Sequence, residues 1–91
     1  MNVTVRYSAQ AQAAAGVAAE TVALDGARTV ADLVKRLAAQ HGEPLRNLLL
    51  RPDGSPTAIL VVVGDEQVRF DDPRPLRDGD VVSLLTPISG G

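Results

Sequence analysis

The first 26 residues alternate apolar and polar side chains in two stretches. The stretch NVTVRY, residues 2–7, repeats with a period of two, which is the pattern of a half-buried β-strand. The stretch ETVAL, residues 20–24, has the same period and runs into Asp25-Gly26, a common turn pair. We therefore expect two strands that pair with each other, with a short helix or turn in the alanine-rich residues 9–16 between them.

The middle of the chain carries the clearest helical pattern. Apolar side chains recur there at i, i+3, i+4, i+7 and i+8, the spacing of one helical face; they are Val30, Leu33, Val34, Leu37 and Ala38. Thr29 is a favourable N-cap, and Asp32 three positions later completes a variant capping box. We expect Gly42 to end this helix in the left-handed conformation, with His41 favoured beside it by the helix dipole.

The second half of the chain predicts three further strands and a short helical turn. The turn falls in the leucine-rich residues 45–49. The β-branched run TAILVVVGD, residues 57–65, is typical of a buried central strand, and EQVRF, residues 66–70, of a short edge strand. The last strand is VVSLLT, residues 81–86. It ends at Pro87, because proline has no N–H to donate to a neighbouring strand.

This order of elements predicts an α+β fold of the β-grasp type. We expect a mixed sheet of four or five strands, with one main helix packed on one face and with the first and last strands as central neighbours. Two of the strands, in residues 57–65 and 81–86, are apolar on both faces. One helix cannot cover both faces of the sheet. Either residues 43–56 or the alanine-rich stretch cover the second face, or part of it is an exposed apolar patch, which usually marks a partner site.

Composition and charge exclude several classes of function. The 91 residues suit one domain, 1–91. The net charge is −2 and there are only two aromatic residues, so the chain has neither the basic patch nor the aromatic platform that nucleic acids require. No apolar run has the length of a membrane span and no signal peptide opens the chain. We therefore expect a cytoplasmic protein with no nucleic-acid or membrane partner.

The residues that hold metals or act as nucleophiles are scarce. There is no cysteine and a single histidine, which excludes disulfides, thiolate metal sites and thiol nucleophiles. Asp78 and Asp80 are more simply turn residues than metal ligands, because no third ligand is indicated nearby. We expect no metal site, no bound cofactor and no catalytic residue.

The last residues of the sequence, 87–91 (PISGG), form a candidate tail after the final strand. Gly90 and Gly91 lack a Cβ atom, so they fit a narrow channel and adopt any φ that a partner's active site imposes. Ile88 is an apolar residue on an otherwise free segment, which suits contact with a groove on a partner. We expect Pro87, Ile88, Ser89 and Gly90 to enter such a channel.

The whole chain resembles the ThiS/MoaD family of ubiquitin-like sulfur carriers. The resemblance rests on the β-grasp pattern, on a Pro-then-Gly-Gly terminus, and on an L-x-D-G-D-x-V turn into the last strand made by Leu76, Asp78, Gly79, Asp80 and Val82. The length favours the MoaD-like branch, and the opening MNVTV and the E-x-V-R-F run are similar to the cysteine-synthesis carrier CysO. The TPISGG tail departs from MoaD-type chains, which commonly have two prolines and an alanine there.

The resemblance implies a non-enzymatic carrier whose C-terminal carboxylate, on Gly91, is the working group. An adenylating enzyme of the ubiquitin-activating type would use ATP to activate this carboxylate, and a sulfur donor protein would convert it to a thiocarboxylate. The leading pathway is molybdenum cofactor biosynthesis, with this chain as the small subunit of molybdopterin synthase and the large subunit as sulfur acceptor. Cysteine synthesis, other thio-metabolites and tRNA thiolation are alternatives.

Two other kinds of function remain open from the sequence. A ubiquitin-like modifier would be joined through Gly91 to lysines of other proteins. A plain β-grasp interaction domain would not need Gly90 and Gly91 at all. In each case a partner must dock on the folded part of the chain, and we expect Phe70, Leu85 and Arg69 to contribute to that surface.

Overall fold

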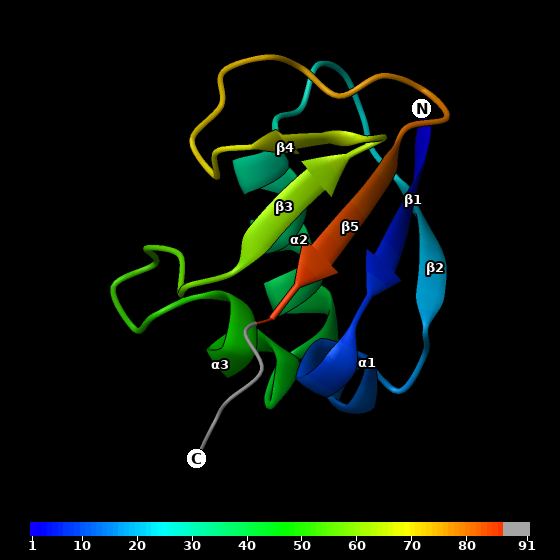
Figure 1. Cartoon of the computed structure of the whole chain (residues 1–91). Coiled ribbons are helices and arrows are strands. Elements are labelled where there is room, and N and C mark those ends of the chain that lie inside the picture. Colours follow the sequence, from blue (N-terminus) through cyan, green and yellow to red (C-terminus); the bar gives the residue numbers. More distant parts are fainter. Residues whose placement is uncertain (87–91) are drawn as a thin grey trace.

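Strands and helices form two layers in the computed structural model, which describes residues 1–86 (Figure 1). A five-stranded sheet makes one layer and three helices make the other. In chain order the elements are β1 (Asn2–Tyr7), α1 (Ala9–Ala15), β2 (Ala19–Ala23), α2 (Val30–His41), α3 (Leu45–Leu49), β3 (Leu60–Val63), β4 (Glu66–Val68) and β5 (Val81–Leu85).

The sheet has the mixed topology that the sequence predicts. Its strand order is β2-β1-β5-β3-β4. The first and last strands, β1 and β5, are parallel neighbours at its centre, with Val5 paired to Val82. The other pairs are antiparallel, and β4 is an edge strand, as expected. The β-grasp prediction is confirmed, with α2 as the main helix and the shorter α1 and α3 in the two segments where short helical structure was expected.

The Asp-Gly-Asp turn before β5 fixes the central parallel pair. The Asn2 amide donates to Asp78 Oδ1 at 2.7 Å, and the Gly79 amide donates to the Asn2 carbonyl at 2.8 Å. The Thr4 amide donates to the Asp80 carbonyl at 2.9 Å. Gly79 has a φ of +87°, which glycine adopts without steric cost. The turn therefore aligns the start of β5 with the start of β1.

Helix α2 begins at the predicted capping box. The Thr29 hydroxyl accepts the Asp32 amide at 3.3 Å, and the Asp32 carboxylate accepts the Thr29 amide at 3.0 Å. This second bond is the main cause that lowers the pKa of Asp32. At the other end Gly42 has a positive φ of 68°, but its ψ is −157°. The left-handed helical conformation predicted for Gly42 is therefore wrong, although a positive φ is still required there.

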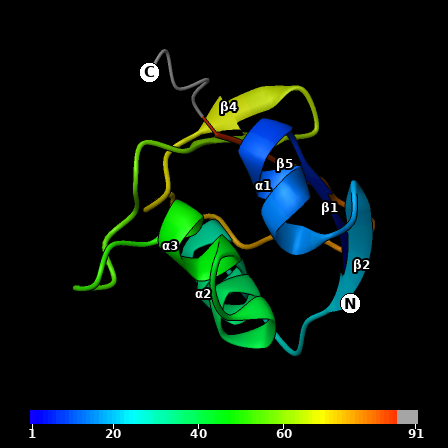
Figure 2. The same cartoon turned by 90° about the horizontal axis from the view of Figure 1, so that it is seen from below.

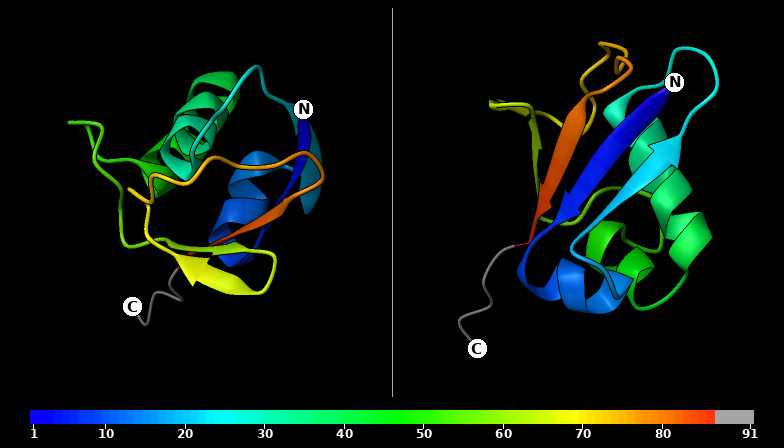
Figure 3. Two further views of the ribbon diagram at one scale, coloured as in Figure 1. Left: turned by 90° about the horizontal axis from the view of Figure 1, so that it is seen from above. Right: turned by 90° about the vertical axis from the view of Figure 1, so that its right-hand side faces the viewer.

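All three helices cover the same face of the sheet (Figures 2 and 3). Helix α3 contacts both α2 and α1. The core between the layers is aliphatic apart from Tyr7, because the chain has so few aromatic residues. Its members are Val3, Val5, Tyr7, Ala11, Val22, Leu24, Val30, Leu33, Val34, Leu37, Leu45, Leu49, Val61, Leu76, Val82 and Leu84.

The second face of the sheet is therefore left open. One alternative from the sequence, that residues 43–56 or the alanine-rich stretch cover it, is wrong. Residues 43–56 and the alanine-rich stretch supply Leu45, Leu49 and Ala11 to the same core as α2, so neither lies over the second face. Strand β3, predicted to be buried, lies inside the sheet between β5 and β4. Only its Val61 is fully buried, whereas Leu60 is 49% exposed. The alternative of an exposed apolar patch is the one that the structure has.

Candidate partner-binding surface

Four apolar side chains form a strip on the open face of the sheet. They alternate with core residues along β3 and β5, so the pleat directs them away from the helices. Leu60 and Val81 are 49% and 36% exposed, and Leu60 pairs with Leu85 across the two strands. We call this set, Leu60, Val62, Val81 and Leu85, the open-face strip.

A groove of about 640 Å³ adjoins the open-face strip beside edge strand β4. Its apolar lining includes Ile59, Leu60, Val68 and Phe70. The segment before β3 makes one wall and the end of β4 makes the other, which brings together residues about ten positions apart in the sequence. Leu60 belongs to both the groove and the strip, so the two surfaces are continuous.

The structure places the three predicted partner residues around this surface in different ways. Leu85 lies in the strip next to Leu60. Phe70 lines the groove and packs in part against the core. Arg69 stands on the groove's rim with its side chain 86% exposed and paired to Asp71 at 2.9 Å. Sequence reasoning left Leu60 out of this set, although its position on the second apolar face of the strand was the signal.

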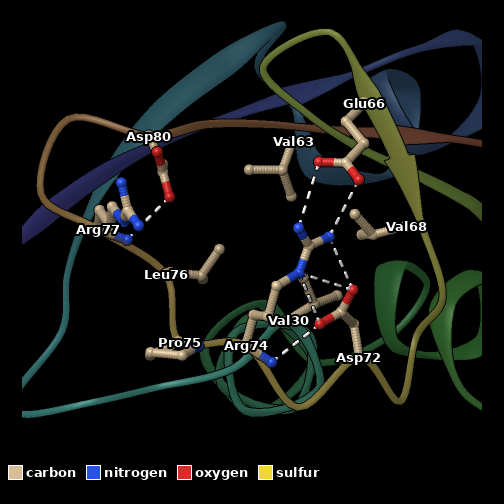
Figure 4. Close-up of a pocket in the computed structure, with 10 residues that line it drawn as sticks. All are labelled: Val30, Val63, Glu66, Val68, Asp72, Arg74, Pro75, Leu76, Arg77 and Asp80. Carbon is tan, nitrogen blue, oxygen red and sulfur yellow. Dashed lines mark hydrogen bonds and ion pairs between the residues drawn. The ribbon is translucent and has the colours of Figure 1, made fainter.

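A separate hollow of about 360 Å³ lies on the helix side of the sheet, near the start of β5 (Figure 4). The Arg74 guanidinium lies there between Asp72 and Glu66, with contacts of 2.9 and 3.3 Å. Arg74 lowers the pKa of the Asp72 carboxyl, chiefly through their side-chain hydrogen bond. Because these charges pair with one another, the cluster ties the 72–74 loop to β4. Of the predicted site residues that the structure describes, Phe70, Leu85 and Arg69, none lines this hollow.

A polar cluster ties β1, β2 and α2 together. The Tyr7 hydroxyl donates to Glu20 Oε2 at 2.6 Å, and His41 Nε2 contacts the same oxygen. Burial raises the pKa of the Tyr7 phenol, and the hydrogen bond and charge of Glu20 raise it further. His41 lies in the last turn of α2, as predicted, and its contact with Glu20 gives it a second structural role that the sequence did not reveal.

The remaining predicted site residues, Pro87, Ile88, Ser89, Gly90 and Gly91, lie outside the described residues. Thr86, the last described residue, follows β5 and is only 8% exposed. Within residues 1–86 no three histidine, cysteine, aspartate or glutamate side chains are grouped so that they could hold a metal ion. In the same part of the chain, no helix has the length and apolar character needed to cross a membrane.

Comparisons with known proteins agree with this fold and place the chain in a family. The ThiS family model matches residues 5–91. The molybdopterin synthase sulfur carrier subunit of Chlamydomonas reinhardtii is 34% identical over 92 residues, covering 100% of both chains. The chain therefore belongs to the ThiS family, and the assignment made from its sequence is confirmed.

Solved structures with the ubiquitin-like β-grasp fold superpose over the full length. SAMP1 of Haloferax volcanii, a small archaeal modifier protein, has a TM-score of 0.86 at 25% identity, with 100% of both chains covered. A complex of subunits 1 and 2 of the molybdopterin-converting factor of Helicobacter pylori contains a similar chain, with a TM-score of 0.62, 25% identity and 100% coverage of both chains. The second of these similar proteins has been solved together with a protein partner.

Proposed function

We propose that this chain is a sulfur carrier that acts with partner enzymes and performs no catalysis itself. The observation that carries the proposal is its family membership together with full-length similarity to a molybdopterin synthase sulfur carrier subunit. We assign it to molybdenum cofactor biosynthesis on that similarity. Cysteine synthesis, another thio-metabolite and tRNA thiolation use the same carrier chemistry and differ only in the molecule that accepts the sulfur.

The proposed chemistry takes place at the carboxylate of Gly91. A carboxylate is a poor electrophile, so one of its oxygens first attacks the α-phosphorus of ATP on the activating enzyme, and pyrophosphate leaves. A sulfur nucleophile at the oxidation level of hydrosulfide then attacks the acyl carbon, forming a C–S bond as the C–O bond to AMP breaks. Gly91 has no side chain to crowd this attack. The partner binds ATP, and this chain needs no cofactor of its own.

We assign the docking of these partners to the open-face strip and the adjoining groove. Exposed apolar patches that are continuous over several side chains usually mark binding sites. The strip reaches Leu85, and the proposed tail begins two residues later at Pro87. A partner that covers the strip would therefore receive the tail beside it. The expected cytoplasmic location suits partners of this kind.

The deciding experiment is intact-protein mass spectrometry of the full chain. The chain is incubated with ATP, sulfide and the ubiquitin-activating-type enzyme of the same cell. We expect a mass gain equal to the exchange of one oxygen for one sulfur, and no gain in a variant that lacks Gly91. An unchanged mass, with the activating enzyme shown to charge another carrier, would contradict the proposal.

A second candidate function is protein modification, which the similarity to SAMP1 favours. It uses the same adenylate, but a lysine amine attacks the acyl carbon and an isopeptide forms. Lys35 is the chain's one lysine, so a Lys35→Arg variant cannot be the ε-amine acceptor and separates conjugates to other proteins from self-conjugates. Isopeptides of Gly91 on other proteins, without a thiocarboxylate, would favour the modifier. Full function without Gly90 and Gly91 would indicate a plain interaction domain.

A further inference from the structure

The end of β5 is tied to the start of α1 by contacts that continue the β1–β5 pairing. The last paired residues of the two strands are Tyr7 and Leu84. Beyond them, the Ser8 amide and hydroxyl both donate to the Leu84 carbonyl, at 3.3 and 3.4 Å. The Thr86 hydroxyl donates to the Ser8 carbonyl at 3.3 Å. Each bond is long, but together they connect Ser8 to Leu84 through its amide and hydroxyl and to Thr86 through its carbonyl.

Thr86 is in a buried position that a polar residue occupies at a cost. It is 8% exposed and, apart from Tyr7, carries the one buried polar side chain in the described part of the chain. Burying a hydroxyl is unfavourable unless it finds a hydrogen-bond partner. The Ser8 carbonyl supplies that partner, and it also accepts the Ala11 amide in the first turn of α1. A valine would fill the same space without the polar group.

The start of α1, next to the contact between Ser8 and Thr86, is also unusual. Ser8 precedes the helix, yet among the described residues its side chain makes no capping bond to α1 and is used for Leu84 instead. Ala9 follows with a φ of +49° and is the one residue besides glycine with a positive φ in residues 1–86. Such backbone strain persists where the surrounding structure holds it in place, and it gathers at working sites.

We propose that Ser8 and Thr86 form a latch that positions the chain's end for activation by its partner. This inference rests on the proposed carrier function. Leu85 lies in the open-face strip, and Thr86, the next residue, is turned to the buried side and held by Ser8. The five residues that follow can span at most about 17 Å when fully extended. A fixed base therefore limits the volume that the terminal carboxylate explores near a partner docked on the strip.

The latch predicts a specific kinetic effect. Thr86→Val keeps the shape of the side chain and removes its hydroxyl, and Ser8→Ala removes the hydroxyl's bond to the Leu84 carbonyl while the Ser8 amide keeps its own. Each variant should lower kcat for pyrophosphate release with the activating enzyme and ATP by about fivefold, since loss of one neutral hydrogen bond corresponds to about that factor. KM for the carrier should stay within about twofold, because the docking strip is unchanged and only orientation is lost.

Two matched variants complete the test. Thr86→Ser retains the hydroxyl and should restore kcat, and Thr21→Val, the same change on exposed strand β2, should leave kcat unchanged. Melting temperatures are measured in parallel, with the assay run well below them. Equal kcat for Thr86→Val and the native chain would overturn the latch, whatever the change in melting temperature. Failure of the native chain itself to be activated would instead contradict the carrier function.

Discussion

Along β3 and β5 the two faces of the sheet both carry aliphatic side chains and differ in what covers them. Along β5, Val82 and Leu84 are 0% exposed beneath the helices. Val81 and Leu85, which flank them, point to the open face with Ser83 between, and Val81 is 36% exposed. One strand thus carries two apolar faces, of which only one meets the core.

This difference separates residues that maintain the fold from residues left free for other contacts. Burial of an aliphatic side chain contributes about 25 cal/mol for each Å² of surface removed from water. The covered face gains this term on folding, and the open face gains it only when a second molecule covers it. The open-face strip should therefore contribute to association much more than to stability.

The largest effect is expected from a truncation in the covered face. Leu84→Ala should lower the free energy of unfolding by about 2–5 kcal/mol, because it leaves a cavity in a closed core. That corresponds to a fall in Tm of roughly 10–20 °C or more for a domain of this size. Urea denaturation measures it, with Leu85→Ala as the matched control on the open face. Similar losses in the two variants would abolish the distinction between the faces.

A charge placed in the open-face strip should weaken partner binding and leave the free energy of unfolding almost unchanged. Leu60→Asp is expected to raise KM for the activating enzyme about tenfold, as loss of a central apolar anchor does at interfaces. Its free energy of unfolding should change by no more than about 0.5 kcal/mol, because Leu60 is 49% exposed and lies outside the core. Thr21→Asp adds the same charge elsewhere on the open face and should leave KM unchanged. An unaltered KM in Leu60→Asp would exclude the strip as the docking surface.

The covered face should also determine how stability depends on alkaline pH. The pKa of Tyr7 is raised in the folded chain, so its phenol stays protonated there when the unfolded phenol ionises near pH 10. The resulting stability is present below pH 10 and is lost as the pH rises above it. Tm measured from pH 9 to 11.5 should fall less steeply in Tyr7→Phe than in the native chain. Equal slopes of Tm against pH in the two proteins would show that Tyr7 does not contribute to the loss of stability at high pH.

The smallest effect concerns the helix that covers the sheet. Thr29→Ala removes the side-chain acceptor of the capping box and should cost about 1 kcal/mol. Thr29→Ser retains the acceptor and should behave like the native chain in the same denaturation experiment. A loss in both variants would mean that the methyl group of Thr29, and not its hydroxyl, is what α2 requires.

Periodic patterns made much of the fold predictable from the sequence. The alternation in residues 2–7 and the helical spacing from Val30 to Ala38 each identify one element, because a core face must repeat with the period of its backbone. The capping box at Thr29 and the turn before β5 depend on local chemistry, and both occur as predicted. The central pairing of β1 with β5 followed from the order of the elements.

The pattern could not decide which face the smaller helices cover. In β3, Leu60 and Val61 are both aliphatic, and the pattern does not show which of them faces the helices. The groove that contains Phe70 depends on how the segment before β3 lies beside β4, which no periodicity encodes. The contact of His41 with Glu20 joins α2 to β2, and no sequence motif or spacing links these two residues. The roles of residues 87–91 remain predictions from their chemistry.

The pairing of β1 with β5 has a consequence for folding while the protein is being synthesised. Strand β1 is synthesised before its central neighbour β5, residues 81–85, and all other strands and helices of the fold lie between them in the sequence. Contacts between such distant segments form late, because a long loop must close before they are made. A nascent or prematurely terminated chain therefore lacks the middle of its sheet. Only a polypeptide translated through β5 can join the β2-β1 pair to the β3-β4 pair in one sheet.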